Sequence, residues 1–287
     1  MKYDLHCHSK EGSLDAKLDI VSYAMMLKTK GYAGMLVTDH DSYKGYQRYE
    51  EQRNAHKLPR ILQDFVVLKG IEYDTRDAGH VLVILPDGIE CPIFEKMGLR
   101  LKVLEQLVHF HGGIMGAAHP YGNGYIGITN TKLYKNDSSV MECFDFIEGY
   151  NSTLKSDKNN MAFQLAEEYG KPVTAGSDAH SVLRVGTAYT VFHEKLTCNN
   201  DLIRYIREQK ETKAVGVFYP ELLKRKNPVI RKAGIAGYWV YNKAGMILRT
   251  GARHRFLKDW NFLKGLDDFS DLKKETGMSS TPILKSL

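Results

Sequence analysis

The sequence has no long apolar run, few cysteines and no glycine-rich nucleotide-binding motif among its 287 residues. No stretch approaches the ~20 apolar residues that a membrane-spanning helix needs. No apolar segment follows Lys2 either, so we expect no secretory signal and a cytoplasmic location. The chain also lacks internal repeats, which excludes a solenoid or a propeller. Its four cysteines match no CxxC zinc or redox motif, and they are Cys7, Cys91, Cys143 and Cys198.

Positive charge is concentrated near the C-terminal end of a chain whose formal net charge is +6. Residues 216–287 contain 14 Lys or Arg against 6 Asp or Glu, whereas residues 1–215 contain 26 against 28. Hydrophobic residues make up 43% of the sequence, as in an ordinary soluble globular protein. The charge asymmetry indicates either an anionic partner or a solvated basic face.

Short runs rich in Val and Ile alternate with helix-length amphipathic segments up to residue 215. We predict strands over Lys2–His8, Met35–His40, Val66–Glu72, His80–Leu85, Ile114–His119, Phe146–Tyr150, Pro172–Ser177 and Ala188–Phe192. We predict helices over Asp15–Lys30, Pro92–His111, Ser156–Tyr169 and Asn199–Lys210. Such alternation favours parallel strands with helices outside them, in a closed or distorted barrel or, alternatively, in an open doubly wound sheet.

The pattern changes after residue 215 and predicts a second, smaller unit. Glu221–Lys232 has the composition of a helix. Tyr238–Tyr241 and Met246–Arg249 flank a turn-like tetrapeptide, which predicts a hairpin. The residues around Pro282 are expected to be loosely ordered. We therefore predict a main domain over residues 1–215 and a small basic α+β appendage over residues 216–287.

Histidine and acidic side chains stand at the ends of five predicted strands. They are His6, His8, Asp39, His40, Asp41, Glu72, His119, Asp178 and His180. The carboxyl ends of parallel strands meet at one edge of the fold, so these side chains should lie together. Cys7 should point away from them, because successive strand residues face opposite sides. Imidazole nitrogen with carboxylate oxygen suits zinc, manganese or iron, which predicts a metal site; taken alone, however, His6 and His8 are also typical of an exposed edge strand.

Individual roles follow from the neighbours of each residue. We expect His40 to be a ligand and Asp39 to orient a ligand, while Asp41 or Ser42 caps the following helix. Glu72 is a candidate bridge between two ions, because each carboxylate oxygen can serve one metal; a salt bridge at the rim is the alternative. A catalytic phosphate-binding role is predicted for Arg184, with a surface ion pair as the alternative.

These segments resemble the PHP family, the polymerase and histidinol phosphatase domain. The resemblance covers residues 2 to about 192 and lies in five ordered motifs: Asp4–His8, Thr38–Asp41, Gly70–Glu72, Ala118–Pro120 and Gly176–His180. Phe146–Asn151 and Val185–Thr190 also resemble segments of the small phosphoesterase branch of that family.

The resemblance implies a distorted (βα)7 barrel with two or three divalent ions, Mn, Zn or Fe, at one end. Carried over motif by motif, it implies a first ion on His6, His8, Glu72 and Asp178. It implies a second ion on Glu72, His119 and His80. It implies a third on His40 and His180 with an acidic residue of the loop after His8, where Glu11 takes the place of the usual aspartate.

The function implied is a metal-dependent phosphoesterase that hydrolyses a nucleotide, a short oligonucleotide or a small phosphoester with metal-activated water. Asp178, His180 and Arg184 are the predicted catalytic residues. The alternatives are a histidinol-phosphatase-like phosphomonoesterase, a non-catalytic metal-binding scaffold and a metal amidohydrolase. The amidohydrolase is disfavoured because no predicted strand end carries the bridging lysine typical of that group.

The appendage adds a possible partner, a short nucleic acid. Aromatic residues there alternate with arginines, as on surfaces that stack bases and bind phosphates. The residues are Tyr238, Trp239, Tyr241 and Trp260 with Arg249, Arg253 and Arg255. The alternative is that the aromatic residues form the small core of the hairpin.

Overall fold

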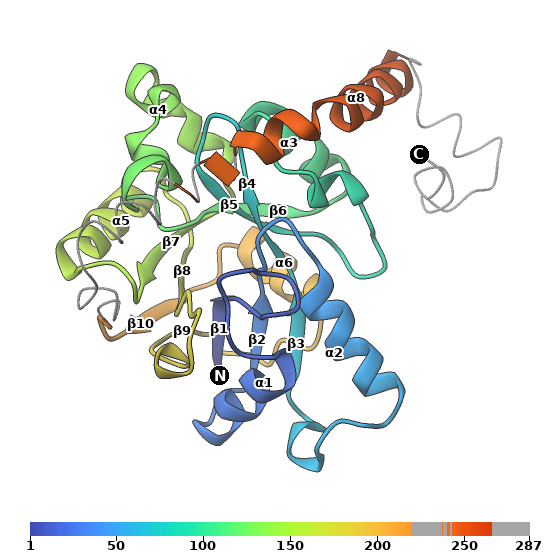
Figure 1. Ribbon diagram of the computed structural model, residues 1–287. Coiled ribbons are helices and arrows are strands. Elements are labelled where there is room, and N and C mark those ends of the chain that lie inside the picture. Colours follow the sequence, from blue (N-terminus) through green and yellow to red (C-terminus); the bar gives the residue numbers. More distant parts are fainter. Residues whose placement is uncertain (220–236, 238–239, 242, 266–287) are drawn as a thin grey trace.

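The computed structural model describes residues 1–219, 237, 240–241 and 243–265, and within them ten strands form two five-stranded sheets (Figure 1). The first sheet has the order β10-β9-β1-β2-β3 and the second the order β4-β5-β6-β7-β8. The first sheet contains β1 (Lys2–Cys7), β2 (Gly34–Val37), β3 (Val66–Lys69), β9 (Ala188–Val191) and β10 (Lys213–Gly216). The second contains β4 (Ile71–Asp74), β5 (His80–Ile84), β6 (Ile114–Ala117), β7 (Phe146–Asn151) and β8 (Val173–Gly176).

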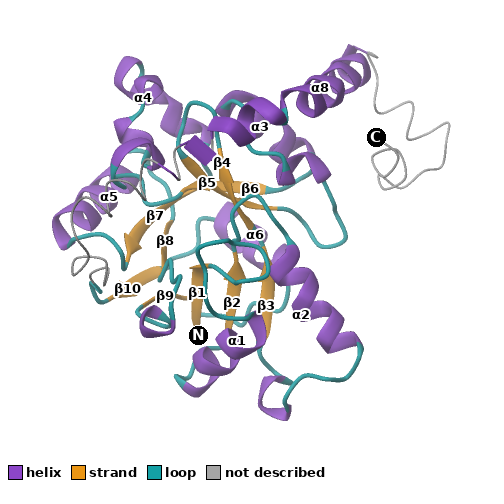
Figure 2. Ribbon diagram, in the orientation of Figure 1, coloured by secondary structure: helices purple, strands orange, loops and turns teal. Residues whose placement is uncertain are grey.

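Helices lie around the outside of the two sheets (Figure 2). They are α1 (Ile20–Thr29), α2 (Lys44–Asn54), α3 (Leu101–Phe110), α4 (Lys132–Asn136), α5 (Ser156–Glu168), α6 (Asn199–Arg207) and α8 (Thr250–Gly265). Helix α1 begins after Asp19, whose carboxylate accepts a hydrogen bond from the Ser22 amide at 2.9 Å, a typical N-cap. Cys7 is buried in the core formed with Tyr23 and Leu27 of this helix, so it points away from the neighbouring histidines as predicted.

The mixed α/β class is confirmed, but the described residues do not form a closed (βα)7 barrel. Strands β1, β2 and β3 are parallel neighbours, as are β6, β7 and β8. The pairs β1–β9, β9–β10, β4–β5 and β5–β6 are antiparallel, which the prediction of an all-parallel sheet missed. Isolated bridges join Cys7 to Ala179 and His40 to Glu72, so the sheets approach each other at the ends of β1 and β2.

The predicted strand Val66–Glu72 is two strands that belong to different sheets. The break falls at Gly70, whose amide donates to the Val37 carbonyl at 2.9 Å. A Cβ atom at this position would lie 2.9 Å from a methyl carbon of Leu36, so the close approach favours glycine. The apolar run gave no other sign of the break. The switch carries Glu72 to the junction between the sheets.

The C-terminal residues differ most from the prediction. Residues 243–248 are helical, so the predicted strand Met246–Arg249 is wrong, and residues such as Ala244 and Met246 are indeed good helix formers. The predicted helix Glu221–Lys232 and the residues around Pro282 lie outside the described residues. No helix in the described part of the chain is both long and apolar enough to cross a bilayer.

Candidate metal centre

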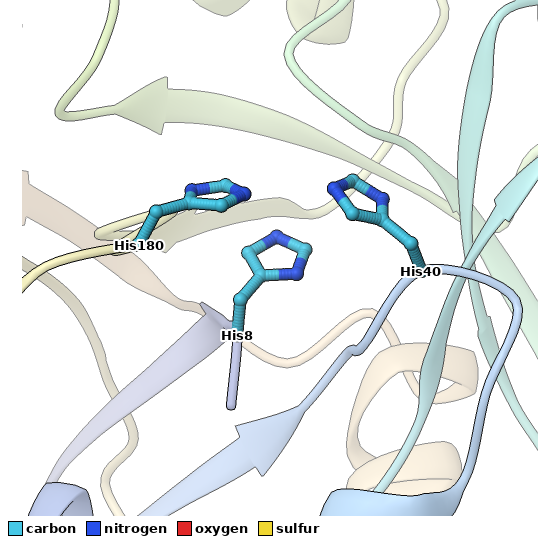
Figure 3. Close-up of side chains that lie close together, drawn as sticks. All are labelled: His8, His40 and His180. Atoms are coloured by element: carbon cyan, nitrogen blue, oxygen red, sulfur yellow. The ribbon is translucent and has the colours of Figure 1, made fainter. Parts of the chain in front are cut away.

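Six histidines and two carboxylates from both sheets converge where the sheets meet. Figure 3 shows the rings of His8, His40 and His180 turned toward one another. Within the described residues, four groups of three side chains have ligand atoms no more than 4.8 Å apart. The groups are His8, His40 and His180; His6, His119 and Asp178; His6, His8 and Glu72; and His40, Glu72 and His80. The structure thus brings together every predicted ligand except Glu11.

Glu72 lies at the middle of this cluster and is 1% exposed. Its Oε1 atom is 2.8 Å from His80 Nδ1 and 2.8 Å from His119 Nε2. Its Oε2 atom is 3.0 Å from His40 Nδ1 and 3.3 Å from His8 Nε2. Oε2 also lies 3.4 Å from His6 Nε2. The two oxygens therefore face different sets of histidines, which is the geometry that a bridging carboxylate requires.

Asp178 closes the other side of the cluster. Its Oδ1 atom lies 3.2 Å from His8 Nε2 and 3.8 Å from His6 Nε2. The loop that carries it is held by Asp4, whose Oδ1 accepts from the Ser177 amide at 2.9 Å. Asp178 has a positive φ of 49°, a conformation that costs energy in a residue other than glycine and is typical of functional sites.

An antiparallel strand explains the position of His80. His80 is the first residue of β5 and pairs with Asp74, the last residue of β4. The start of an antiparallel strand lies beside the end of its neighbour. His80 thus reaches the same edge as Glu72, although it begins a strand instead of ending one.

Charge within the cluster is strongly coupled. Burial alone would raise the pKa of Glu72, but His80, His6 and His40 hold it well below its usual value. Burial would lower the pKa of His40, but Glu72 raises it to about 10. In the protein without ions, protonated imidazoles therefore provide the positive charge that the carboxylates need.

The chemistry of the donors fits divalent ions. His6 Nε2, His8 Nε2, His80 Nε2, His119 Nδ1 and Glu72 Oε2 are buried and have no hydrogen-bond partner. Buried polar atoms without partners are costly, so their concentration here indicates a ligand. Imidazole nitrogens with carboxylate oxygens form the donor set of zinc, manganese or iron. The cluster therefore has the donor atoms, within 4.8 Å of one another, that such ions need.

Glu148 on β7 orients two of the ligands, and the sequence analysis did not select it. Its Oε1 lies 2.9 Å from His6 Nδ1, which leaves Nε2 of that ring free to face an ion. Its Oε2 accepts from the His119 amide at 2.6 Å and from the Asn151 side chain at 3.1 Å. A buried carboxylate in the otherwise apolar segment Phe146–Ile147–Glu148 was the available signal.

Asp39 orients a ligand indirectly, through Ser13. The Ser13 hydroxyl donates to Asp39 Oδ1 at 2.9 Å and lies 3.2 Å from His8 Nδ1. Because the hydroxyl hydrogen is donated to the carboxylate, the Ser13 oxygen must accept a hydrogen bond from the N–H at His8 Nδ1. His8 is thereby held with Nε2 facing Glu72 and Asp178. Ser13 was not selected from the sequence.

Asp15, and not Glu11, is the acidic residue next to His40 and His180. Asp15 Oδ2 lies 3.2 Å from His180 Nε2 and 3.8 Å from His40 Nε2. Glu11 instead accepts a hydrogen bond from the Ile20 amide at the start of α1, at 3.2 Å. The sequence does not indicate that Asp15 takes the place expected for Glu11, because both residues lie in the irregular loop between β1 and α1.

Arg184 is 8% exposed, so the alternative of a surface ion pair does not describe it. It ends a short 3-10 helix, Val182–Arg184, that follows the loop with Asp178 and His180. Within the described residues its side chain forms no ion pair or hydrogen bond. Its predicted contact with phosphate stays a prediction.

Comparison with known proteins gives three findings. A family model described as PHP-associated matches residues 156–211. A Vibrio atlanticus (strain LGP32) protein named a probable phosphatase is 26% identical over 208 residues, which are 65% of this chain and 81% of that protein. PsfC from Pseudomonas syringae PB-5123 has a similar structure, with a TM-score of 0.57 and 17% identity over 85% of this chain and 98% of that one.

Proposed function

We propose that this chain is a PHP-type metal-dependent phosphoesterase. The resemblance to PHP proteins that the motifs predicted is confirmed by the PHP-associated match and by the phosphatase relative. The observation that carries the proposal is Glu72, whose two oxygens face different sets of histidines inside a buried cluster. Neighbouring ions that share one carboxylate suit an in-line attack on phosphorus, because they stabilise both the attacking and the leaving oxygen.

The ligand sets are those that the family resemblance implies, with one exchange that the contacts of the cluster support. We assign His6, His8, Glu72 and Asp178 to a first ion and Glu72, His80 and His119 to a second. His40, His180 and Asp15 would hold a third, so Asp15 takes the place that the family resemblance gives to Glu11. Ions bound there would act as Lewis acids on the phosphoryl group and lower the pKa of water toward ~7.

The exposure of the ligands indicates the side from which a substrate enters. The side chains of His6, His8 and Glu72 are at most 1% exposed, whereas those of His180 and Asp15 are 24% and 48% exposed. The ester must therefore approach over His180 and Asp15. Arg184, four residues after His180, is our candidate for binding a phosphoryl oxygen, since guanidinium matches phosphate in a bidentate way.

The test combines metal content with turnover. The protein is purified without chelator, bound metal is measured by elemental mass spectrometry, and phosphate release is followed from nucleotides, histidinol phosphate and small phosphoesters. We expect two or more equivalents of metal, and loss of both metal and activity in His8→Ala and Asp178→Ala. His109→Ala is the matched control, because His109 pairs with Asp145 at 3.0 Å and belongs to none of the four ligand groups.

Two outcomes would contradict the proposal. One tightly held zinc and no hydrolysis of any phosphate ester would favour the metal-binding scaffold. Cleavage of amides, with no release of phosphate, would favour the amidohydrolase.

A further inference from the structure

Exposure divides the side chains of the metal centre into a closed group and an open group. The side chains of Glu72 and Asp178 are 1% and 11% exposed, whereas that of Asp15 is 48% exposed. The two imidazoles beside Asp15 are open as well, with His180 at 24% and His40 at 17%. The other four are at most 4% exposed, and they are His6, His8, His80 and His119. Solvent therefore reaches the set assigned to a third ion and hardly reaches the other two sets.

The carboxylate of Asp178 is oriented by a buried amide. Asn151 is 0% exposed, and its Nδ2 atom donates to Asp178 Oδ2 at 3.3 Å and to Glu148 Oε2 at 3.1 Å. The Thr153 amide donates to Asn151 Oδ1 at 3.0 Å, which turns the NH2 group toward the two carboxylates. Oδ2 of Asp178 is thus engaged, and Oδ1 is left to face His6 and His8.

The carboxylate of Asp15 has no partner of this kind. Its Oδ2 atom meets only His180 Nε2 at 3.2 Å and His40 Nε2 at 3.8 Å, and in the part of the chain that the structure describes no amide or hydroxyl donates to it. The backbone around it is nevertheless fixed, because the Lys17 amide donates to the His180 carbonyl at 3.1 Å. The turn therefore places Asp15 beside the two histidines but leaves its carboxylate to be ordered by what binds there.

The C-terminal helix α8 docks on another part of the main domain. Arg253 donates to the backbone carbonyl of Met97 at 2.5 Å, and Trp260 packs edge to face on Phe110 of α3, with ring centroids 4.6 Å apart. Figure 1 shows α8 beside α3, whereas the loop with Asp15 leads into α1. Arg253 and Trp260 thus serve docking and are not part of an exposed stacking surface, and Asp15 stays 48% exposed with α8 in place.

These differences set the order in which the ligand sets bind metal. A partner that orients a metal ligand typically contributes about 10- to 100-fold in affinity, and Asp178 has such a partner where Asp15 has none. Ordering a free side chain also costs conformational entropy, which a fixed carboxylate does not lose again. We therefore expect the open set to bind a given ion at least about tenfold more weakly than the closed sets.

We propose that His40, His180 and Asp15 form an exchangeable metal site, which fills at a higher free metal concentration than the two buried sites and thereby regulates turnover. This inference rests on the proposed phosphoesterase function. The substrate approaches over His180 and Asp15, so it meets this site first. Three protein ligands leave a coordination position open, as in catalytic metal sites, and a phosphoryl oxygen can take that position.

The test measures bound metal in the full-length protein as a function of free Mn²⁺. The protein is dialysed to equilibrium against buffers of increasing free Mn²⁺, and bound manganese is measured by elemental mass spectrometry. We expect two equivalents to bind first and a third to bind with a Kd at least about tenfold higher. Three equivalents of equal affinity would overturn the proposal, and so would saturation at two.

Asp15→Asn and Glu11→Gln form a matched pair of variants, because both residues lie in the loop between β1 and α1. Asp15→Asn should abolish the third equivalent or raise its Kd by about tenfold or more, and it should leave the first two unchanged. Glu11→Gln should bind all three as the wild type does, since Glu11 accepts from the Ile20 amide instead. Loss of one of the first two equivalents in Asp15→Asn would overturn the proposal, as would loss of the third in Glu11→Gln.

Turnover tests the regulatory part. In the wild type, kcat/KM for p-nitrophenyl phosphate should rise about tenfold or more over the range of free Mn²⁺ in which the third equivalent binds, and Asp15→Asn should not show this rise. Full activity with two equivalents would overturn the regulation.

Failure of the phosphoesterase itself gives a different result, because dialysis needs no turnover. If no ester is hydrolysed, inorganic phosphate is the probe. Phosphate in the dialysis buffer should lower the Kd of the third equivalent several-fold in the wild type and have no such effect in Asp15→Asn, since two ligands that bind together strengthen each other reciprocally. A third equivalent that is indifferent to phosphate would exclude a site that the substrate completes.

Discussion

Glu72 and Asp74 are two residues apart on one face of β4, yet their surroundings differ completely. Glu72 faces five histidines, and His80, His6 and His40 hold its pKa far below the usual value despite burial. Asp74 is also buried, but its carboxylate oxygens have no hydrogen-bond partner among the described residues, and burial raises its pKa. The comparison separates two regions: a metal centre built around ionised Glu72, and a rim where Asp74 and Asp41 meet the basic C-terminal segment.

The strongest way to break this comparison is to neutralise each carboxylate in turn. We expect Glu72→Gln to lower metal affinity and kcat by more than about a hundredfold, because it removes the charge shared by the ions. Asp74→Asn should retain the metal content of the wild type. Elemental analysis gives the metal content of each variant, and phosphate release gives its kcat. Similar metal loss in the two variants would mean that the rim also holds an ion.

Loss of the Ser13 hydroxyl tests the positioning inside the metal centre. Ser13→Ala should weaken metal binding about tenfold or more, because His8 Nδ1 then loses its fixed acceptor. Ser9→Ala is the matched control: the Ser9 hydroxyl also donates to Asp39, at 2.7 Å, but among the described residues it forms no hydrogen bond to a histidine of the cluster. Titration with Mn²⁺ gives the affinities. Equal effects in the two serine variants would point to Asp39 packing instead of orientation of His8.

Whether a site residue could be predicted from the sequence depended on the element that carries it: the end of a parallel strand, the start of an antiparallel strand or a loop. Residues at the ends of parallel strands, such as His8 and His119, followed from a general rule of α/β folds. His80 begins an antiparallel strand, so only the family resemblance indicated it. Asp15 depended on the path of a loop, and a loop path is set by tertiary contacts such as the hydrogen bond from the Lys17 amide to the His180 carbonyl, 3.1 Å.

For the fold, the sequence predicted where the strands lie but not how they pair. Nearly every predicted strand is present, because the apolar runs mark buried segments whatever their partners. Which strands pair, and in which direction, depends on contacts far apart in sequence. The single run Val66–Glu72 therefore hid a change of sheet. The strand β10 (Lys213–Gly216) was missed too, and within the described part of the chain it is an edge strand that pairs with β9. The helical residues 243–248 were missed because a turn-like tetrapeptide suggested a hairpin.

The pH dependence of metal binding tests whether the histidine cluster around Glu72 is protonated when no ion is bound. Burial lowers the pKa of His40, but Glu72 raises it to about 10. His40 is therefore protonated at neutral pH in the ion-free protein, and a bound ion must displace that proton. The histidine–carboxylate pairs stabilise the ion-free protein fully below the unfolded histidine pKa, and this contribution is lost as pH rises through about 10. The increase in Tm on adding Mn²⁺ should therefore be larger at pH 8 than at pH 6, by scanning calorimetry. An increase that is independent of pH would contradict proton displacement.

The smallest effect is expected for the stability of the rim. Burial raises the pKa of Asp74, so the folded state resists ionisation that the unfolded state allows, and stability falls as pH rises above the unfolded aspartate pKa. Asp74→Asn removes this penalty and should raise the Tm of the ion-free protein by about 2–4 °C at pH 8, with less gain at pH 4. Thermal melts at the two pH values measure the difference. A lower Tm at pH 8 would mean that the ionised carboxylate of Asp74 is stabilised in the folded state by the cations near it, so that its negative charge contributes to stability instead of opposing it.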